Sequence, residues 1–211
     1  MSATFDKAAL KWAVRLGTST LFEAAGIATS SVEPTIRTIW SGAKVAGPAF
    51  PLECSPGDNL AIHIAMEKAP RGSVLVISAS GFIAGYWGEV LTVAAEAAGI
   101  VGLVIDGGVR DIAALRARAF PVFARGVSMR GTIKASVASV GQPISLAGTP
   151  VEAGDLVVAD DDGVLVLPRP AVADTLVRAQ ARAEKEAAMM EKLKSGQTTL
   201  DLLGLSKWHE S

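Results

Sequence analysis

Between residues 73 and 125 the sequence reads SVLVISASGFIAGYWGEVLTVAAEAAGIVGLVIDGGVRDIAALRARAFPVFAR. Three short and almost unbroken apolar runs, typical of strands covered on both faces, occupy residues 73–78, 100–105 and 121–125. Two segments with helical character lie between these runs, at 88–98 and 111–119. This order of strands and helices predicts parallel strands joined by right-handed crossovers. We expect Asp106–Gly108 to turn the chain after the middle strand.

The flanking segments differ from this central part. Two short helices are predicted ahead of it, at 5–15 and 18–25, and a long charged helix is predicted at 168–194. Strands predicted at 132–140, 154–159 and 163–167 are closely spaced, which favours a second and more antiparallel sheet. We therefore expect one α/β domain with two packed sheets, spanning residues 1–211. It comprises N-terminal helices at 1–34, a core at 35–167, and a C-terminal helix and tail at 168–211.

Composition restricts the class of protein. The 211 residues are 50% hydrophobic and 19% charged, which excludes general disorder. A net charge of −1 argues against nucleic acid or an anionic membrane as a partner. A single cysteine excludes an internal disulfide, and two histidines argue against a multi-histidine zinc site. With no secretory signal and no apolar run of about 20 residues, a cytoplasmic location is expected.

Ligands of parallel α/β sheets collect beyond the carboxyl ends of the strands. Residues 78–89 and 106–111 follow two such ends and should lie side by side. The helix start at Gly88–Leu91 offers unpaired backbone N–H groups that attract anions, although its glycines can equally serve a tight turn. Arg110 offers a planar fork for a carboxylate, and Asp111 offers hard oxygen ligands for magnesium or manganese. Two other interpretations stay open: Asp111 caps the following helix, or Arg110 pairs with Asp106 or Glu89.

Several motifs of the chain, taken in order, resemble the RraA-like family. That family includes class II 4-hydroxy-4-methyl-2-oxoglutarate and 4-carboxy-4-hydroxy-2-oxoadipate aldolases. The resemblance spans roughly residues 35–190, and no single motif is specific by itself. The motifs are Val45-Ala-Gly-Pro-Ala49, Pro56-Gly-Asp-Asn59, Gly85-Tyr-Trp-Gly-Glu89, Gly102-Leu-Val-Ile-Asp-Gly-Gly-Val-Arg-Asp111, Phe120-Pro-Val-Phe-Ala-Arg-Gly126 and Gly154-Asp-Leu-Val-Val-Ala-Asp-Asp-Asp-Gly-Val164.

The resemblance implies a swivelling β/β/α fold and a homotrimer or hexamer with sites between subunits. It implies a lyase that cleaves 4-hydroxy-2-oxo di- or tricarboxylic acids, as in aromatic catabolism, to pyruvate and a second keto acid. Asp111 is implied to hold the divalent cation, Mg²⁺ or Mn²⁺, and Arg110 to bind the 2-oxo acid. The backbone of Gly88, Glu89, Val90 and Leu91 is implied to receive the substrate carboxylate. Glu89, and Glu186 from a neighbouring subunit, are implied to act on the metal through water.

Two positions depart from the pattern of the aldolases that the chain resembles. Glu89 stands where those aldolases have aspartate, and Ala114 stands where they often have an acidic residue. The departure at Ala114 bears on the choice of substrate more than on the metal.

Cleavage at the predicted site would pass through a pyruvate enolate, which Arg110 and the cation would stabilise. Oxaloacetate decarboxylation passes through the same enolate and is expected as a side activity. A lysine that forms an imine is the enzymatic alternative, with Lys44 and Lys134 as candidates, although both lysines can also be structural. His63 is more simply a core or interface residue. The alternative from another class is a non-catalytic protein-binding regulator of ribonuclease activity, as in family members that inhibit an RNA-degrading enzyme.

Overall fold

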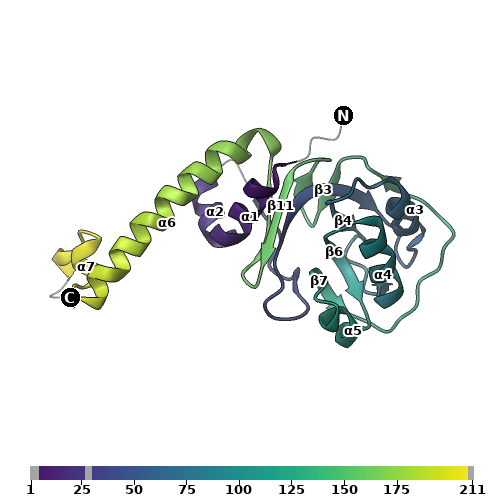
Figure 1. Ribbon diagram of the computed structural model, residues 1–211. Helices are drawn as coiled ribbons and strands as arrows, with labels where there is room; N and C mark the ends of the chain where they lie inside the picture. Colours follow the sequence, from purple (N-terminus) through teal and green to yellow (C-terminus); the bar gives the residue numbers. More distant parts are fainter. Residues whose placement is uncertain (1–4, 27–29, 209–211) are drawn as a thin grey trace.

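The computed structural model of the protein describes residues 5–26 and 30–208 (Figure 1). Residues 1–4 and 209–211, at the ends of the predicted domain, lie outside this range. The fold is a mixed α/β single domain with a nearly closed, barrel-like sheet and a second, smaller sheet, so the predicted fold class is confirmed. Strand order in the large sheet is β1 (Ser30–Ser31), β12 (Gly163–Leu167), β11 (Leu156–Asp160), β3 (Val45–Glu53), β4 (Val74–Ser78), β6 (Gly102–Val109), β7 (Val122–Val127) and β2 (Arg37–Thr38). In addition, β5 (Gly85–Trp87) pairs with β6, and β8 (Ser139–Val140) pairs with β3.

The parallel half of the sheet carries the predicted alternation of strands and helices. Its strands are β3 (Val45–Glu53), β4 (Val74–Ser78), β5 (Gly85–Trp87), β6 (Gly102–Val109) and β7 (Val122–Val127). The helices α3 (Leu60–Lys68), α4 (Glu89–Ala98) and α5 (Ile112–Ala117) cover its outer face (Figure 1). An aliphatic core that includes Leu75, Leu103 and Ile105 fills the space between strands and helices. Burial on both faces explains why these strands are apolar at successive positions.

The antiparallel half completes the barrel. It consists of β11 (Leu156–Asp160), β12 (Gly163–Leu167), β1 (Ser30–Ser31), β2 (Arg37–Thr38) and β8 (Ser139–Val140). A separate hairpin of β9 (Ile144–Leu146) and β10 (Thr149–Val151) forms the smaller sheet. Side chains from both halves, Val76 and Val157 among them, meet in a second core inside the barrel.

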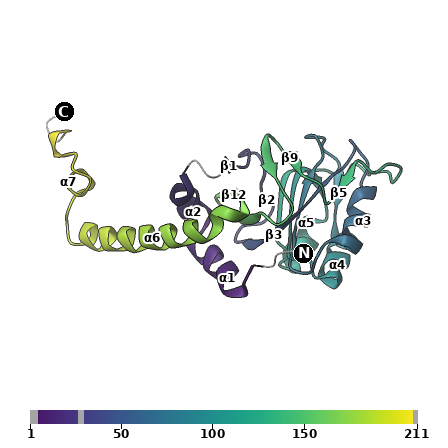
Figure 2. The same ribbon diagram turned by 90° about the horizontal axis from the view of Figure 1, so that it is seen from above.

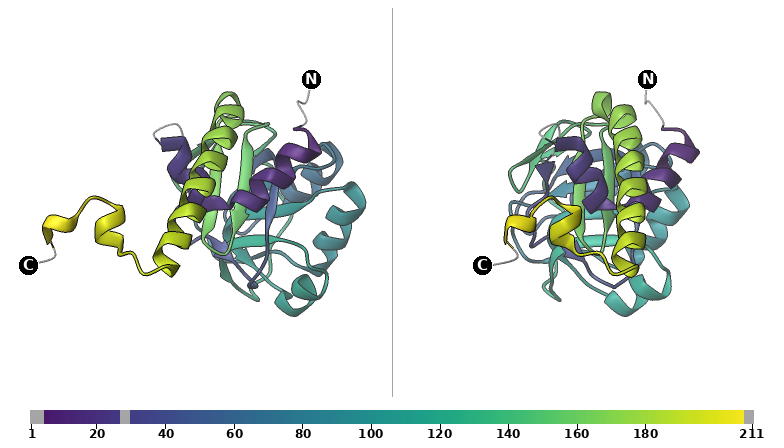
Figure 3. Two further views of the ribbon diagram at one scale, coloured as in Figure 1. Left: turned by 60° about the vertical axis from the view of Figure 1, so that its left-hand side comes forward. Right: turned by 90° about the vertical axis from the view of Figure 1, so that its left-hand side faces the viewer.

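A third core joins the outer face of β11 and β12 to the terminal helices. These helices are α1 (Lys7–Leu16), α2 (Thr18–Ala25) and α6 (Val172–Lys194), which follows the short helix η2 (Arg169–Ala171). Figure 3 shows α6 crossing the antiparallel strands beside α1 and α2. Beyond it, α7 (Thr199–Leu202) and η3 (Ser206–Trp208) extend away from the barrel (Figure 2). Among the described residues, no helix combines the length and the apolar composition that crossing a membrane requires.

Two predicted elements differ in the structure. Asp106–Gly108 is not a turn, because β6 continues through it to Val109 with a shift in register between Ile105 and Gly108. Glycine is needed there because a Cβ on Gly108 would lie 2.5 Å from the carbonyl oxygen of Ala84. The strand predicted at 132–140 is reduced to an isolated bridge at Ile133 and to β8.

Candidate active site

The ends of β5 and β6 and the start of α4 meet at one cavity of about 270 Å³. Five of the predicted site residues line this cavity, namely Gly88, Val90, Leu91, Arg110 and Asp111. The remaining lining residues are Asn59, His63, Gly85, Tyr86, Trp87, Gly131, Thr132 and Lys134. The two segments that follow the strand ends, at 78–89 and 106–111, therefore meet at this cavity, as predicted.

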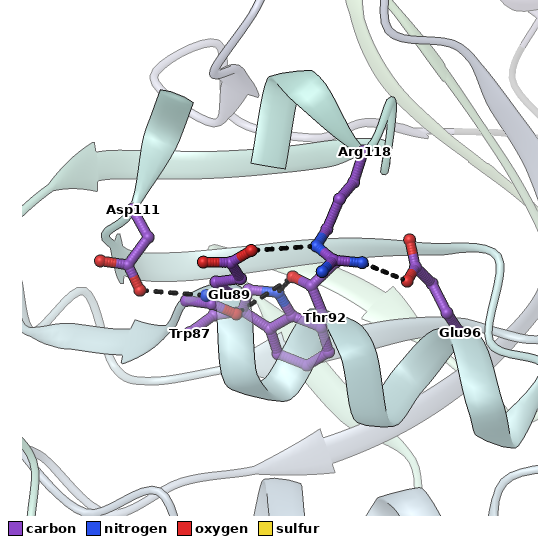
Figure 4. Close-up of polar contacts among 7 residues, drawn as sticks. Trp87, Glu89, Thr92, Glu96, Asp111 and Arg118 are labelled. Atoms are coloured by element: carbon purple, nitrogen blue, oxygen red, sulfur yellow. Dashed lines mark hydrogen bonds and ion pairs between the residues drawn. The ribbon is translucent and has the colours of Figure 1, made fainter. Parts of the chain in front are cut away.

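Gly88 connects β5 to α4 at a position without room for a side chain. Its φ of −164° is ordinary extended backbone, so the reason for glycine is space. A Cβ at Gly88 would lie 2.3 Å from Asp111 Oδ2 and 3.1 Å from Arg110 Cγ. Two hydrogen bonds of the Thr92 side chain fix the first turn of α4. Trp87 Nε1 donates to Thr92 Oγ1 at 2.7 Å, and Thr92 Oγ1 donates to the Gly88 carbonyl at 3.0 Å (Figure 4).

Asp111 lies where β6 gives way to α5, in the left-handed conformation with φ of 59°. Non-glycine residues rarely adopt this region, although aspartate tolerates it better than most, and such residues cluster at functional sites. Asp111 occupies the N-cap position of α5, but its side chain makes no capping bond there. Instead Asp111 Oδ2 accepts a hydrogen bond of 3.0 Å from the backbone N–H of Glu89 (Figure 4). The carboxylate thus caps the neighbouring helix α4.

Arg110 is held by its backbone, whose N–H donates to the Trp87 carbonyl at 2.8 Å. Its Nε lies 3.8 Å from Asp111 Oδ2, and the two side chains are 51% and 42% exposed. A contact this long and this exposed contributes little to stability, so both groups remain available to a ligand. Asp106, an alternative partner for Arg110 in the sequence analysis, is buried and instead accepts from the N–H of Gly81 at 3.2 Å.

Glu89 does not line the cavity. Its carboxylate accepts a hydrogen bond of 3.2 Å from Arg118 Nε, and the same guanidinium binds Glu96 at 3.0 Å (Figure 4). The side chain therefore lies along the surface between α4 and α5. Glu186 is also outside the cavity of its own chain, because α6 lies on the far side of the barrel from α4 (Figure 1). Its Oε1 accepts from Arg182 Nε at 2.8 Å.

Sequence reasoning missed one side of the cavity, formed by Asn59, His63 and Lys134. Asn59 stands in the motif Pro56–Asn59 without a predicted role, and Lys134 is predicted either as an imine-forming or as a structural lysine. Burial, and to a lesser degree the charge of Lys134, lower the pKa of His63. Lys44, the other imine candidate, is exposed and does not line the cavity.

The chemistry of the donor set suits a hard divalent cation only in part. Asp111 is the one acidic residue that lines the cavity within the described part of the chain. No group of three or more His, Cys, Asp or Glu side chains that could enclose a metal occurs among the described residues. Mg²⁺ commonly binds through one or two carboxylates and takes its other ligands from substrate and water. The residues present therefore fit a cation that has one protein carboxylate as a ligand and takes its other ligands from substrate and water.

Substituting alanine for glycine should reduce stability less at the candidate site than inside the sheet. Gly108→Ala places a methyl group against backbone and should lower the free energy of unfolding by about 1–3 kcal/mol, as overpacking typically does. Gly88→Ala meets side-chain atoms of Asp111 and Arg110 and no backbone, and side chains can move aside more easily than backbone, so its loss of stability should be smaller. Urea denaturation of both variants measures this difference. An equal loss in both would mean that Gly88 is as constrained as Gly108.

The lowered pKa of His63 gives a second expectation. Because the native state resists protonation of His63, stability should fall as the pH drops through the ordinary pKa of histidine, about 6.5. In His63→Gln this part of the pH dependence should disappear. Urea midpoints at pH 7.5 and pH 5.5 measure it, and the loss on acidification should be smaller in the variant than in the parent. Equal losses would contradict a native His63 that stays neutral.

The chain is similar to one family model and to three known proteins. A family model described as RraA-like, Aldolase/RraA, matches residues 18–166. A protein of Halalkalibacterium halodurans named "Putative 4-hydroxy-4-methyl-2-oxoglutarate aldolase" is 36% identical over 160 residues, covering 75% of this chain and 76% of that protein.

Two solved structures have the same fold. An uncharacterised protein from Pseudomonas syringae pv. tomato matches with a TM-score of 0.84 and 31% identity, over 94% of this chain and 93% of that one. Streptomyces coelicolor RraAS2, described as an unusual member of the RNase ES inhibitor RraA protein family, matches with a TM-score of 0.78 and 26% identity. This match covers 89% of the present chain and 98% of RraAS2.

Proposed function

Because the chain belongs to the RraA-like family of aldolases and RraA proteins, we propose that it is a metal-dependent carbon–carbon lyase. The proposed substrates are 4-hydroxy-2-oxo di- or tricarboxylic acids, and the products are pyruvate and a second keto acid. The observation that carries the proposal is one cavity in which a guanidinium, a carboxylate and the start of a helix converge, at Arg110, Asp111 and Gly88–Leu91. The similarity to a protein named as an aldolase supports the reaction type.

In this proposal Asp111 holds the divalent cation, Mg²⁺ or Mn²⁺. The cation, when bound, supplies Lewis-acid polarisation of the 2-oxo group. A carboxylate offers two oxygens, so Asp111 could hold the cation through one of them while Oδ2 keeps the N–H of Glu89, which it binds at 3.0 Å. The first-turn N–H groups of Val90 and Leu91, which lack partners within the helix, are proposed to receive the substrate carboxylate together with the backbone of Gly88 and Glu89.

Arg110 is proposed to stabilise the charge that develops during cleavage. Removal of the proton from the C4 hydroxyl lets the C3–C4 bond break, and C4 leaves as the carbonyl of the second keto acid. The bonding electrons pass into the 2-oxo group and form the pyruvate enolate, which takes a proton at C3 to give pyruvate. A fixed guanidinium beside the enolate oxygen lowers the barrier because it needs no rearrangement at the moment of reaction.

Glu89 and Glu186 are proposed as more distant contributors that act on the cation through water. Glu89 would first have to leave Arg118, which its carboxylate binds at 3.2 Å. Glu186 can contribute only from another subunit of a trimer or hexamer, since α6 of the same chain lies on the far side of the barrel (Figure 1).

The test of the proposed activity is pyruvate release from 4-hydroxy-4-methyl-2-oxoglutarate and from oxaloacetate. We expect release from both with Mg²⁺ or Mn²⁺, and its loss on chelation. Activity that survives chelation would contradict the metal dependence. Lys134 lines the cavity, so borohydride trapping in the presence of pyruvate distinguishes an imine mechanism, which would leave a covalent adduct on this lysine.

A non-catalytic regulator of ribonuclease activity is the second candidate, supported by the similarity to RraAS2. A regulator acts through contact and does not require the groups in the cavity. Ribonuclease inhibition by the purified chain, retained in Asp111→Asn and unaccompanied by pyruvate release, would favour this candidate over the lyase.

A further inference from the structure

Arg118 joins the two helices that begin at the candidate site. It directly follows α5, and its guanidinium reaches two carboxylates of α4. Arg118 Nε lies 3.2 Å from Glu89 Oε1, and Arg118 Nη1 lies 3.0 Å from Glu96 Oε2 (Figure 4). Glu89 is the first residue of α4 and Glu96 follows two turns later on the same face, so one guanidinium can span both. One positive charge is thereby shared between two negative charges.

Stability accounts for little of this arrangement. The side chains of Arg118, Glu89 and Glu96 are 34%, 49% and 38% exposed. Ion pairs between side chains this exposed are screened by water and salt, so they contribute little to the free energy of folding. Even a weak ion pair holds a side chain in one orientation until a stronger partner competes for it. The main consequence of the contact is therefore the place in which it keeps the Glu89 carboxylate.

Glu89 is joined to the proposed cation ligand through its backbone but not through its carboxylate. Its N–H donates to Asp111 Oδ2 at 3.0 Å, whereas its carboxylate binds Arg118. In Figure 4 one carboxylate oxygen of Glu89 points to the guanidinium, and the other points in the direction of Asp111. A glutamate side chain turns about three torsions. The Glu89 carboxylate can therefore turn toward Asp111 while α4 stays in place.

The cavity offers little negative charge to a divalent cation. Asp111 is the one acidic residue that lines it within the described part of the chain, whereas Arg110 and Lys134 are basic. A doubly charged cation is repelled by these two groups and attracted by Asp111 alone, so a second carboxylate strengthens its binding considerably. The substrate brings one carboxylate. Within the chain, Glu89 is the acid whose backbone is already bonded to Asp111.

We infer that Arg118 is a positioning residue, which keeps the cation affinity of the substrate-free protein low by holding the Glu89 carboxylate away from the cation. The guanidinium competes with the cation in two ways. It fixes the orientation of the carboxylate, and it neutralises the charge that would attract the cation. The inference rests on the proposed function, in which Glu89 acts on the cation through water, and adds to it the control of cation binding.

Binding of Mn²⁺ to the full-length protein without substrate tests this inference, and it requires no turnover. The EPR signal of free Mn²⁺, followed during a titration, gives the Kd of the cation. Arg118→Met keeps the length of the side chain but removes its charge. This variant should bind Mn²⁺ about 3- to 5-fold more tightly than the parent protein, the upper part of the range for losing a competing exposed ion pair.

Two further variants separate an action through Glu89 from a general effect of charge. Arg116→Met is the matched control, because Arg116 is exposed in α5 and forms no ion pair with Glu89 among the described residues. It removes the same charge and should change the Kd much less. In the double variant Glu89→Gln/Arg118→Met the gain should disappear relative to Glu89→Gln, since the carboxylate that Arg118 withholds is no longer there. Urea midpoints should stay close to that of the parent protein in Arg118→Met and Arg116→Met.

Equal Kd values in Arg118→Met and Arg116→Met would overturn the inference. A gain that persists in the double variant would also overturn it, because Arg118 would then act through its charge alone and not through Glu89. If Asp111→Asn binds Mn²⁺ as tightly as the parent protein, the cation lies elsewhere and the proposed cation site itself fails. That result differs from a failure confined to Arg118, in which Asp111→Asn weakens binding and Arg118→Met leaves it unchanged.

Discussion

Arg110→Ala should lower kcat for pyruvate release by about 10²- to 10³-fold, the typical effect of removing one group that stabilises a developing oxyanion. The guanidinium is 51% exposed and lies 3.8 Å from Asp111, so its removal should change stability little. The loss should therefore appear in turnover while the urea midpoint stays close to that of the parent. Steady-state kinetics on 4-hydroxy-4-methyl-2-oxoglutarate and a denaturation curve provide both measurements.

Arg110→Lys is the control for this experiment. Lysine keeps the charge but lacks the planar fork, so it should recover only part of the lost turnover. Full activity in Arg110→Ala would show that the guanidinium does not act on the reacting atoms. A large drop in the urea midpoint would instead assign it a structural role.

Asp111→Asn should have the larger effect, a loss of about 10³-fold or more in pyruvate release, because the Lewis acid contributes several kcal/mol to the transition state. Asparagine tolerates the left-handed backbone at φ of 59° and keeps an oxygen that can accept from the N–H of Glu89. The variant should therefore fold, whereas alanine would be strained at this position. What it loses is the negative charge that is proposed to hold the cation.

A binding measurement independent of activity accompanies this variant. Mg²⁺ or Mn²⁺ should raise the thermal midpoint of the parent protein, since a ligand that binds only the native state stabilises it. The cation should have little effect on Asp111→Asn. An equal rise in both proteins would place the cation elsewhere and contradict the role assigned to Asp111.

Much of the parallel half could be predicted from sequence because its strands are buried on both faces. Val74–Ser78 is the clearest case, as all five of its residues are buried. The turn predicted at Asp106–Gly108 was wrong because glycines next to a strand indicate flexibility, whereas here Gly108 serves a close approach to Ala84. The strand predicted at 132–140 was largely wrong because backbone N–H groups of Ala135 and Ser136 bind the Asp58 side chain, which no periodicity reveals.

The candidate site, too, could be predicted from the sequence only in part. The adjacency of Gly88, Arg110 and Asp111 follows from parallel strand order, since neighbouring strands place their carboxyl ends together. The bond from Glu89 N to Asp111 and the pairing of Glu89 with Arg118 depend on how α4 and α5 are rotated against each other. Sequence patterns do not determine that rotation. Asn59, His63 and Lys134 lie together because the long segment between β7 and β8 returns to α3. No sequence pattern predicts that return either.

Arg110 and Asp111, beside the start of α4, are proposed to form and stabilise a pyruvate enolate. Exchange of pyruvate methyl protons in D₂O, followed by NMR, tests this most directly because it requires no knowledge of the second keto acid. We expect exchange with Mg²⁺ or Mn²⁺ in the parent protein, and strong losses in Arg110→Ala, in Asp111→Asn and after chelation. Undiminished exchange in both variants, or its absence in a parent protein that binds pyruvate and the cation, would contradict the claim.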